Sequence, residues 1–211
     1  MGIKERKERE RERRVSAILK AAKWLIARQG VEGMSMNQLA ERTELNKATL
    51  YTHFASKDDL IDAVVCEALG KLEEAFERDG GAAGTGLARV LDLTRTTFAF
   101  YREHPVYFYA LTHQERRGPG QARNTPFSAL GDEIASRIFG HVAEGVERGI
   151  ADGSIREGVD VGRFQVLYFA HTYGVMHTVF AKEDVYADVL GLDAESVEGA
   201  ALELLEVYLK R

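Results

Sequence analysis

Apolar residues recur at helical spacing along almost the whole chain. Intervals of three and four residues place side chains on one face of a helix. Segments with this spacing cover residues 15–29, 57–78, 86–101, 127–151, 160–181 and 193–211. The residue before a proline disfavours the helical conformation, so one helix ends at His104 and another begins at Pro105. With two short helices between residues 35 and 54, the pattern predicts an all-α protein of about nine helices.

Capping residues define those two short helices. Ser35 is a favourable N-cap, and Gln38 follows three residues later, where the two side chains satisfy each other's backbone amides. This helix is expected to end near Thr43. Asn46 is a second N-cap, which leaves residues 44–45 as the turn. Two helices joined by so short a turn must cross steeply.

The second short helix has one apolar face and several polar ones. Leu50 and Phe54 lie at i and i+4 and can anchor it. The other faces carry Lys47, Thr49, Thr52 and His53. A major groove admits a single helix, and such side chains suit phosphate oxygens and base edges. The segment therefore indicates DNA reading.

At these residues the sequence resembles the TetR (tetracycline repressor) family of bacterial transcriptional regulators. The resemblance rests on Thr49-Leu50-Tyr51, His53-Phe54, Lys57 and Leu60. It implies a helix-turn-helix DNA-binding domain over residues 1–56 with a charged arm over 1–14, a connecting helix over 57–78, and an effector-binding and dimerisation domain over 79–211. Glu44 departs from the family, which has glycine in the turn, and a left-handed conformation is uncommon for other residues.

The resemblance also implies which residues contact double-stranded DNA. The expected set is Ser35, Asn46, Lys47, Thr49, Tyr51, His53 and Lys57. Phosphates are the expected partners of Ser35, Tyr51 and Lys57, and base edges those of Lys47, Thr49 and His53. The alternatives are a core position for Tyr51 and a solvated surface charge for Lys57.

The second half of the chain is rich in aromatic residues with interspersed hydroxyl and imidazole groups. A mostly apolar cavity with a few polar groups is the usual form of a small-molecule site, here for a hydrophobic effector. Expected effector-binding residues are Phe98, Tyr101, Tyr109, His113, Tyr168 and His171. The alternative is that these residues only fill the core. The resemblance implies dimerisation through residues 160–181 and 193–211, with Leu204, Leu205, Tyr208 and Leu209 at the interface.

Charge is unevenly distributed along the 211 residues, whose net charge is −5. Residues 1–60 hold 13 Lys and Arg against 9 Asp and Glu, so this part is basic and the remainder acidic. A protein of acidic composition can thus bind a polyanion through one surface. Residues 4–14 alternate in sign, with 7 basic and 4 acidic side chains, and are either a solvated helix or an arm along the DNA backbone.

Several other classes of protein are not indicated. His171 and His177 are six residues apart and do not share a helix face, so no metal site is expected. No cofactor or enzyme motif is recognisable, and the glycine-rich segment 80–86 lacks the strand and lysine of a phosphate loop. No long apolar run or signal segment is present, and the single Cys66 agrees with a reducing cytoplasm.

The expected function is that of a ligand-responsive transcriptional regulator. It would act as a homodimeric repressor on a palindromic operator and be released by a small hydrophobic effector. The alternative is a constitutive, architectural DNA-binding protein whose body only dimerises and has no effector.

Overall fold

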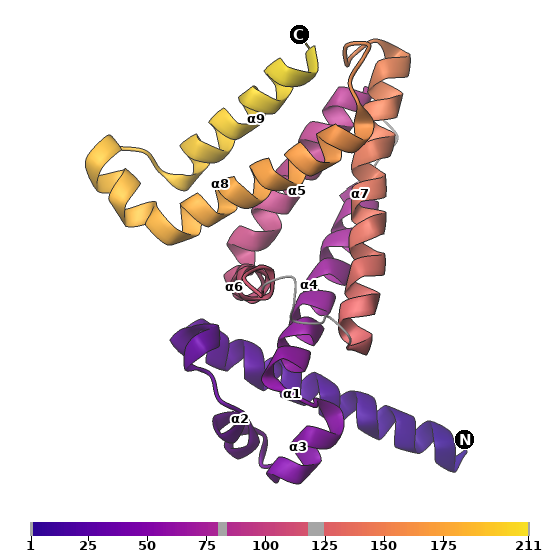
Figure 1. The fold of residues 1–211 in the computed structure, drawn as a ribbon, viewed down its shortest axis with the longest axis vertical. Helices are drawn as coiled ribbons and strands as arrows, with labels where there is room; N and C mark the ends of the chain where they lie inside the picture. Colours follow the sequence, from indigo (N-terminus) through magenta and orange to yellow (C-terminus); the bar gives the residue numbers. More distant parts are fainter. Residues whose placement is uncertain (1, 80–83, 118–124, 211) are drawn as a thin grey trace. The chain divides into compact units, whose positions relative to one another are not determined.

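The computed structural model describes residues 2–79, 84–117 and 125–210, and in these ranges the chain is all-α, as predicted (Figure 1). The nine helices of the described residues are α1 (Ile3–Gly33), α2 (Met36–Thr43), α3 (Lys47–His53), α4 (Lys57–Asp79), α5 (Gly86–Glu103), α6 (Pro105–Glu115), α7 (Pro126–Asp152), α8 (Val161–Leu190) and α9 (Ala194–Lys210). None of these helices combines the length and apolar character that crossing a membrane requires.

The capping predictions for α2 and α3 are confirmed. The Ser35 hydroxyl accepts a hydrogen bond from the Gln38 backbone amide, and the Gln38 side chain accepts one from the Ser35 amide. The Asn46 side chain accepts from the amide of Thr49 at 2.7 Å. Glu44 has φ 55° and ψ 26° and ends α2 in the left-handed conformation. The turn therefore keeps the conformation that glycine would favour, at the cost of mild strain.

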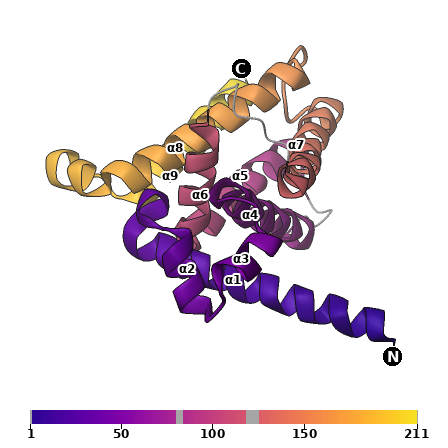
Figure 2. The ribbon, with the colours of Figure 1, turned by 60° about the horizontal axis from the view of Figure 1, so that its bottom comes forward.

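Helix α1 begins earlier than the apolar pattern predicts. Residues 4–14 are helical and exposed. Their alternating charges therefore form a solvated extension of the helix whose apolar stripe starts at Val15. The extension projects past α2 and α3 in both views (Figure 1 and Figure 2). Gly30 has φ 73° and interrupts the helical geometry, which matches the predicted end of the apolar stripe.

Helix α8 is longer than predicted. The expected end near residue 181 is wrong, because the helix continues to Leu190 and ends at Gly191 in the left-handed conformation. No glycine or proline lies between residues 181 and 190, so Gly191 is the first residue that favours termination. The predicted loops at 80–86 and 117–126 fall largely outside the described residues.

The chain divides into two compact units, each built from two segments. Unit 1 contains Met1–Leu69 and His104–Glu133, and unit 2 contains Gly70–Glu103 and Ile134–Arg211. Helices α4 and α7 contribute to both units. The predicted functional boundaries at residues 56 and 78 stay a prediction. They differ from this division by packing, because α6 packs against α1 of the predicted DNA-binding domain.

Polar side chains join α6 to α1 and α4 inside unit 1. Lys23 donates hydrogen bonds to both Glu67 carboxylate oxygens and to the Tyr107 hydroxyl. The buried Asp62 carboxylate accepts from the Gln114 side chain and pairs with Arg117. Buried charges need such partners, so these contacts fix α6 against α4.

In unit 2, α5 begins in close contact with the end of α7. The amide of Gly86 donates to an Asp152 carboxylate oxygen at 2.8 Å, and a Cβ at Gly86 would overlap the backbone of Gly145 and Gly149. A hydrogen bond from the Ser154 side chain, followed by that from the Gly86 amide, holds the pKa of Asp152 below its usual value. Only glycine fits this crossing.

We expect Gly86→Ala to lower the free energy of unfolding by about 3 kcal/mol, because both neighbours are backbone atoms that cannot move independently. Gly140→Ala on α7 is the matched control. A Cβ there meets no atom within 4 Å, so this substitution should stabilise the helix by about 0.5–1 kcal/mol. Urea unfolding of both variants measures the difference, and equal midpoints would contradict the close approach.

Candidate nucleic-acid interface

Helix α3 has a buried side and an exposed side. Leu50 and Phe54 are fully buried in unit 1, and the Phe54 ring stacks on Phe127 at 5.7 Å. Lys47 is exposed, and Tyr51, one turn later on the same face, is 46% exposed. The alternative of a core position for Tyr51 is therefore wrong. The anchored helix presents a lysine and a phenol outward, as a groove-reading helix must.

Thr49 and His53 lie at the edge of this exposed face and are half-buried. Burial, and then the positive charges of Arg11 and Arg14 on α1, lower the pKa of His53. The ring is therefore neutral near pH 7. Its Nδ1 atom is buried and has no hydrogen-bond partner among the residues described. The guanidinium groups bring the basic extension of α1 close to the end of α3, so the two elements form one electropositive surface within unit 1.

Three other predicted contact residues already have partners in the protein. Ser35 and Asn46 are exposed but use their side chains to cap α2 and α3. The Lys57 ammonium donates to the Glu32 backbone carbonyl at 3.2 Å and is half-buried. Lys57 is thus held at the end of α1 rather than freely solvated, and its contact with DNA stays a prediction.

Two residues of the exposed face were not among the predicted contacts. Ala48 and Thr52 are one turn apart on α3, and both are exposed. Their i, i+4 spacing, next to that of Lys47 and Tyr51, was visible in the sequence. Ala48 can meet a thymine methyl group, whereas the Thr52 hydroxyl donates to the Thr49 backbone carbonyl at 2.6 Å.

The six predicted effector-binding residues lie in different units. Tyr109 is exposed and His113 half-buried in unit 1, where the His113 Nδ1 atom lies 3.0 Å from a Glu32 carboxylate oxygen. The other four, Phe98, Tyr101, Tyr168 and His171, belong to unit 2. An effector role for all six stays a prediction.

Within unit 2, the aromatic members of this set are buried between α5 and α8. Phe98, Tyr101 and Tyr168 are at most 5% exposed. The Tyr168 hydroxyl lies 3.5 Å from the Thr94 hydroxyl, and burial raises the pKa of Tyr168 and of Tyr101. Both phenols therefore remain protonated and can donate hydrogen bonds in an apolar interior.

The predicted dimer residues on α9 face two directions. Leu205 and Leu209 are buried inside unit 2 itself. Leu204 is 65% exposed and Tyr208 40% exposed. Helix α8, which runs alongside α9, also has exposed apolar residues at Val166 and Leu167 (Figure 1). Val166, Leu167, Leu204, Val207 and Tyr208 are exposed apolar residues of these two helices, and we refer to them together as the apolar α8–α9 face.

His171 and His177, the histidines considered as metal ligands in the sequence, each have another partner in the structure. The Nε2 atom of His171 lies 3.0 Å from the backbone carbonyl of Ala201, which ties α8 to α9. His177 is exposed and its ring stacks on Tyr173 at 6.2 Å. Neither histidine belongs to a group of three or more metal-ligating side chains among the residues described.

Comparison with known sequences supports the interpretation of the first helices. The family profile described as "Bacterial regulatory proteins, tetR family" matches residues 18–64. An HTH-type transcriptional regulator of Saccharopolyspora erythraea is 26% identical over 110 residues, which are 52% of this chain and 45% of that protein. The match thus spans less than half the length of this relative.

Comparison with solved structures supports the fold of the whole chain. The transcriptional regulator FadR from Bacillus subtilis, in complex with stearoyl-CoA, superposes with a TM-score of 0.71 at 21% identity and covers 92% of this chain and 98% of its own. AibR, in complex with isovaleryl coenzyme A and operator DNA, superposes with a TM-score of 0.67 at 20% identity, covering 90% and 97%.

Proposed function

Because the chain belongs to the TetR family of bacterial regulatory proteins, we propose that it is a ligand-responsive transcriptional regulator. In this proposal a homodimer represses from a near-palindromic operator and a small hydrophobic effector releases it. The observation that carries the proposal is the outward face of α3, where Lys47 and Tyr51 project from a helix anchored by Leu50 and Phe54.

We assign different parts of the DNA to different parts of unit 1. The exposed face of α3 would enter the major groove, with Lys47 on a base edge and Tyr51 on a phosphate. Arg11 and Arg14 lie near the end of α3 and would contact the flanking backbone. In this arrangement α3 recognises the base sequence, and the α1 extension supplies electrostatic attraction to the phosphates.

We propose that the apolar α8–α9 face pairs with the same face of a second copy. An isologous contact of this kind buries side chains such as Leu204 and Val166, whose exposure in a monomer would be unfavourable. The two-fold axis would present two copies of α3, so the operator should have two inverted half-sites.

For the effector we propose an acyl thioester of coenzyme A. Two of the similar structures contain such molecules, stearoyl-CoA and isovaleryl coenzyme A. Phe98, Tyr101 and Tyr168, which are buried in unit 2, would line the acyl chain. Helix α4 belongs to both units and is the element through which binding would change DNA affinity, by about 5–150-fold.

We further propose that the protein acts in the cytoplasm and regulates by binding alone, without catalysis. Operator release by an effector needs only different affinities of the two conformations for DNA. The buried Cys66 thiol, whose pKa burial raises, supports a structural role in a reducing compartment.

Selection from a random DNA pool followed by footprinting tests the proposal. We expect one enriched inverted repeat, one protected region on a DNA fragment that carries it, and loss of protection when an acyl-CoA of suitable chain length is added. Diffuse protection without an enriched motif would instead indicate an architectural DNA-binding protein. Protection unaffected by a series of acyl-CoAs would reject this effector class and leave the operator proposal intact.

The Arg11→Ala/Arg14→Ala variant should bind the operator more weakly, and its affinity should depend less on salt concentration. The plot of log K against log salt should become shallower by about 0.9 for each phosphate that the variant no longer neutralises. Arg9→Ala is the matched control, because Arg9 is exposed on the opposite side of α1. A slope equal to that of the unmodified protein would show that the extension of α1 does not contact the backbone.

A further inference from the structure

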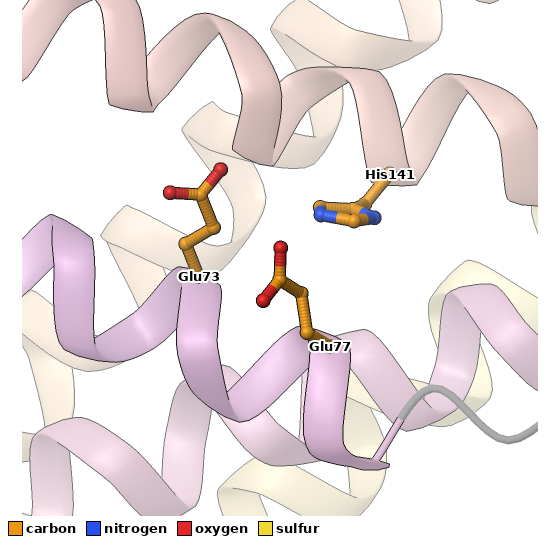
Figure 3. A group of neighbouring side chains, drawn as sticks. All are labelled: Glu73, Glu77 and His141. Atoms are coloured by element: carbon orange, nitrogen blue, oxygen red, sulfur yellow. The ribbon is translucent and has the colours of Figure 1, made fainter.

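Three side chains with metal-ligating atoms meet in unit 2, and none of them belongs to the predicted effector-binding or dimer residues. Glu73 and Glu77 lie one turn apart on α4, and His141 faces them from α7 (Figure 3). One ligand atom from each residue lies within 4.8 Å of the other two. Two helices that are far apart in the sequence thus bring two carboxylates and an imidazole together.

Two of these groups have no other polar partner among the residues described. Glu77 is exposed, and neither its carboxylate nor the His141 imidazole makes a hydrogen bond or ion pair there. The buried Phe76 ring packs edge-on against the His141 ring, with centroids 6.0 Å apart and an interplanar angle of 82°. The imidazole is therefore oriented by an apolar contact while its nitrogens stay available.

The third group, Glu73, is oriented by an arginine. Arg137 donates to both Glu73 carboxylate oxygens, at 2.5 and 2.9 Å, and this pairing lowers the pKa of Glu73. Each carboxylate oxygen has two lone pairs, so one on each oxygen remains for a second partner. Carboxylate ligands of metal ions are commonly supported by outer hydrogen bonds of this kind.

We propose that Glu73, Glu77 and His141 bind a divalent transition-metal ion of the zinc class. Imidazole favours zinc and its neighbours, whereas calcium and magnesium prefer oxygen ligands alone. Three protein ligands leave a fourth position for water. A tetrahedral ion needs ligand atoms about 3.3 Å apart, so the three side chains would close around it from separations of up to 4.8 Å. The ion would join α4 to α7 within unit 2.

Calorimetric titration of the purified protein with zinc chloride tests the site, with the absorption spectrum of bound cobalt(II) as a second readout. We expect one ion per chain, with a dissociation constant at or below about 100 µM. Metal-loaded protein should also melt at a higher temperature than metal-free protein.

The variants His141→Ala and Glu77→Gln should each weaken binding at least about 10-fold, the lower end of what removal of a ligand or supporting partner costs. Glu77 is exposed, so its variant keeps the fold even if removal of the His141–Phe76 contact destabilises the other. Glu74→Gln, one residue along α4 and exposed, is the matched control and should bind as the unmodified protein does. Absence of binding, or equal binding by all variants, would overturn the site without affecting the proposed regulator.

Discussion

Lys47→Ala/Tyr51→Ala should bind the selected operator about 100-fold more weakly than the unmodified protein. Each specific contact on a base or phosphate contributes about 1–3 kcal/mol, and both side chains belong to the exposed face of α3. Because neither packs in the core, the melting temperature should stay within a few degrees. Fluorescence anisotropy with labelled operator measures the affinity.

Two further variants make this result specific. Tyr51→Phe retains the ring and removes the hydroxyl. Its operator affinity should fall only by the contribution of the hydrogen bond between that hydroxyl and a phosphate. Lys20→Ala is the control, because Lys20 is exposed on the side of α1 opposite Arg11. If the double variant binds the operator as tightly as Lys20→Ala, α3 is not the reading helix.

Leu204→Glu is expected to convert the dimer into a folded monomer and to lower operator affinity by about 10²–10⁴-fold. The side chain is 65% exposed in the single chain, so a glutamate there does not disturb the interior of unit 2. In a dimer it would place two like charges in an apolar interface. A monomer binds only one half-site and loses the gain from simultaneous attachment.

Sedimentation and operator binding should be measured on the same samples. Leu130→Glu is the matched control, since this leucine is also exposed but lies on α7 in unit 1, outside the α8–α9 face. A Leu204→Glu protein that remains dimeric would place the interface elsewhere. Leu205→Glu would not be informative, because Leu205 is buried within its own chain and the variant should unfold.

Leu204 and Leu205 mark the limit of what a pattern of apolar residues can predict. Both belong to one apolar stripe, and helical periodicity puts them only about 100° apart. Which of the two faces inward depends on where α5 and α8 pack against α9, and that is a property of the folded unit. The same holds for α6, which the sequence placed in the body. Its Tyr107 hydroxyl accepts a hydrogen bond from Lys23 and donates one to Glu67, and these contacts hold α6 in unit 1.

Features that depend on interactions over a few residues are predictable from the amino-acid order alone. The capping of α2 by Ser35, the capping of α3 by Asn46 and the anchoring by Leu50 all follow from interactions within one helical turn or from helical spacing. No such local rule places Arg11 near His53, or His141 opposite Glu73 and Glu77. These groups are brought together by helix packing, whose geometry depends on the shapes of all the side chains between the helices.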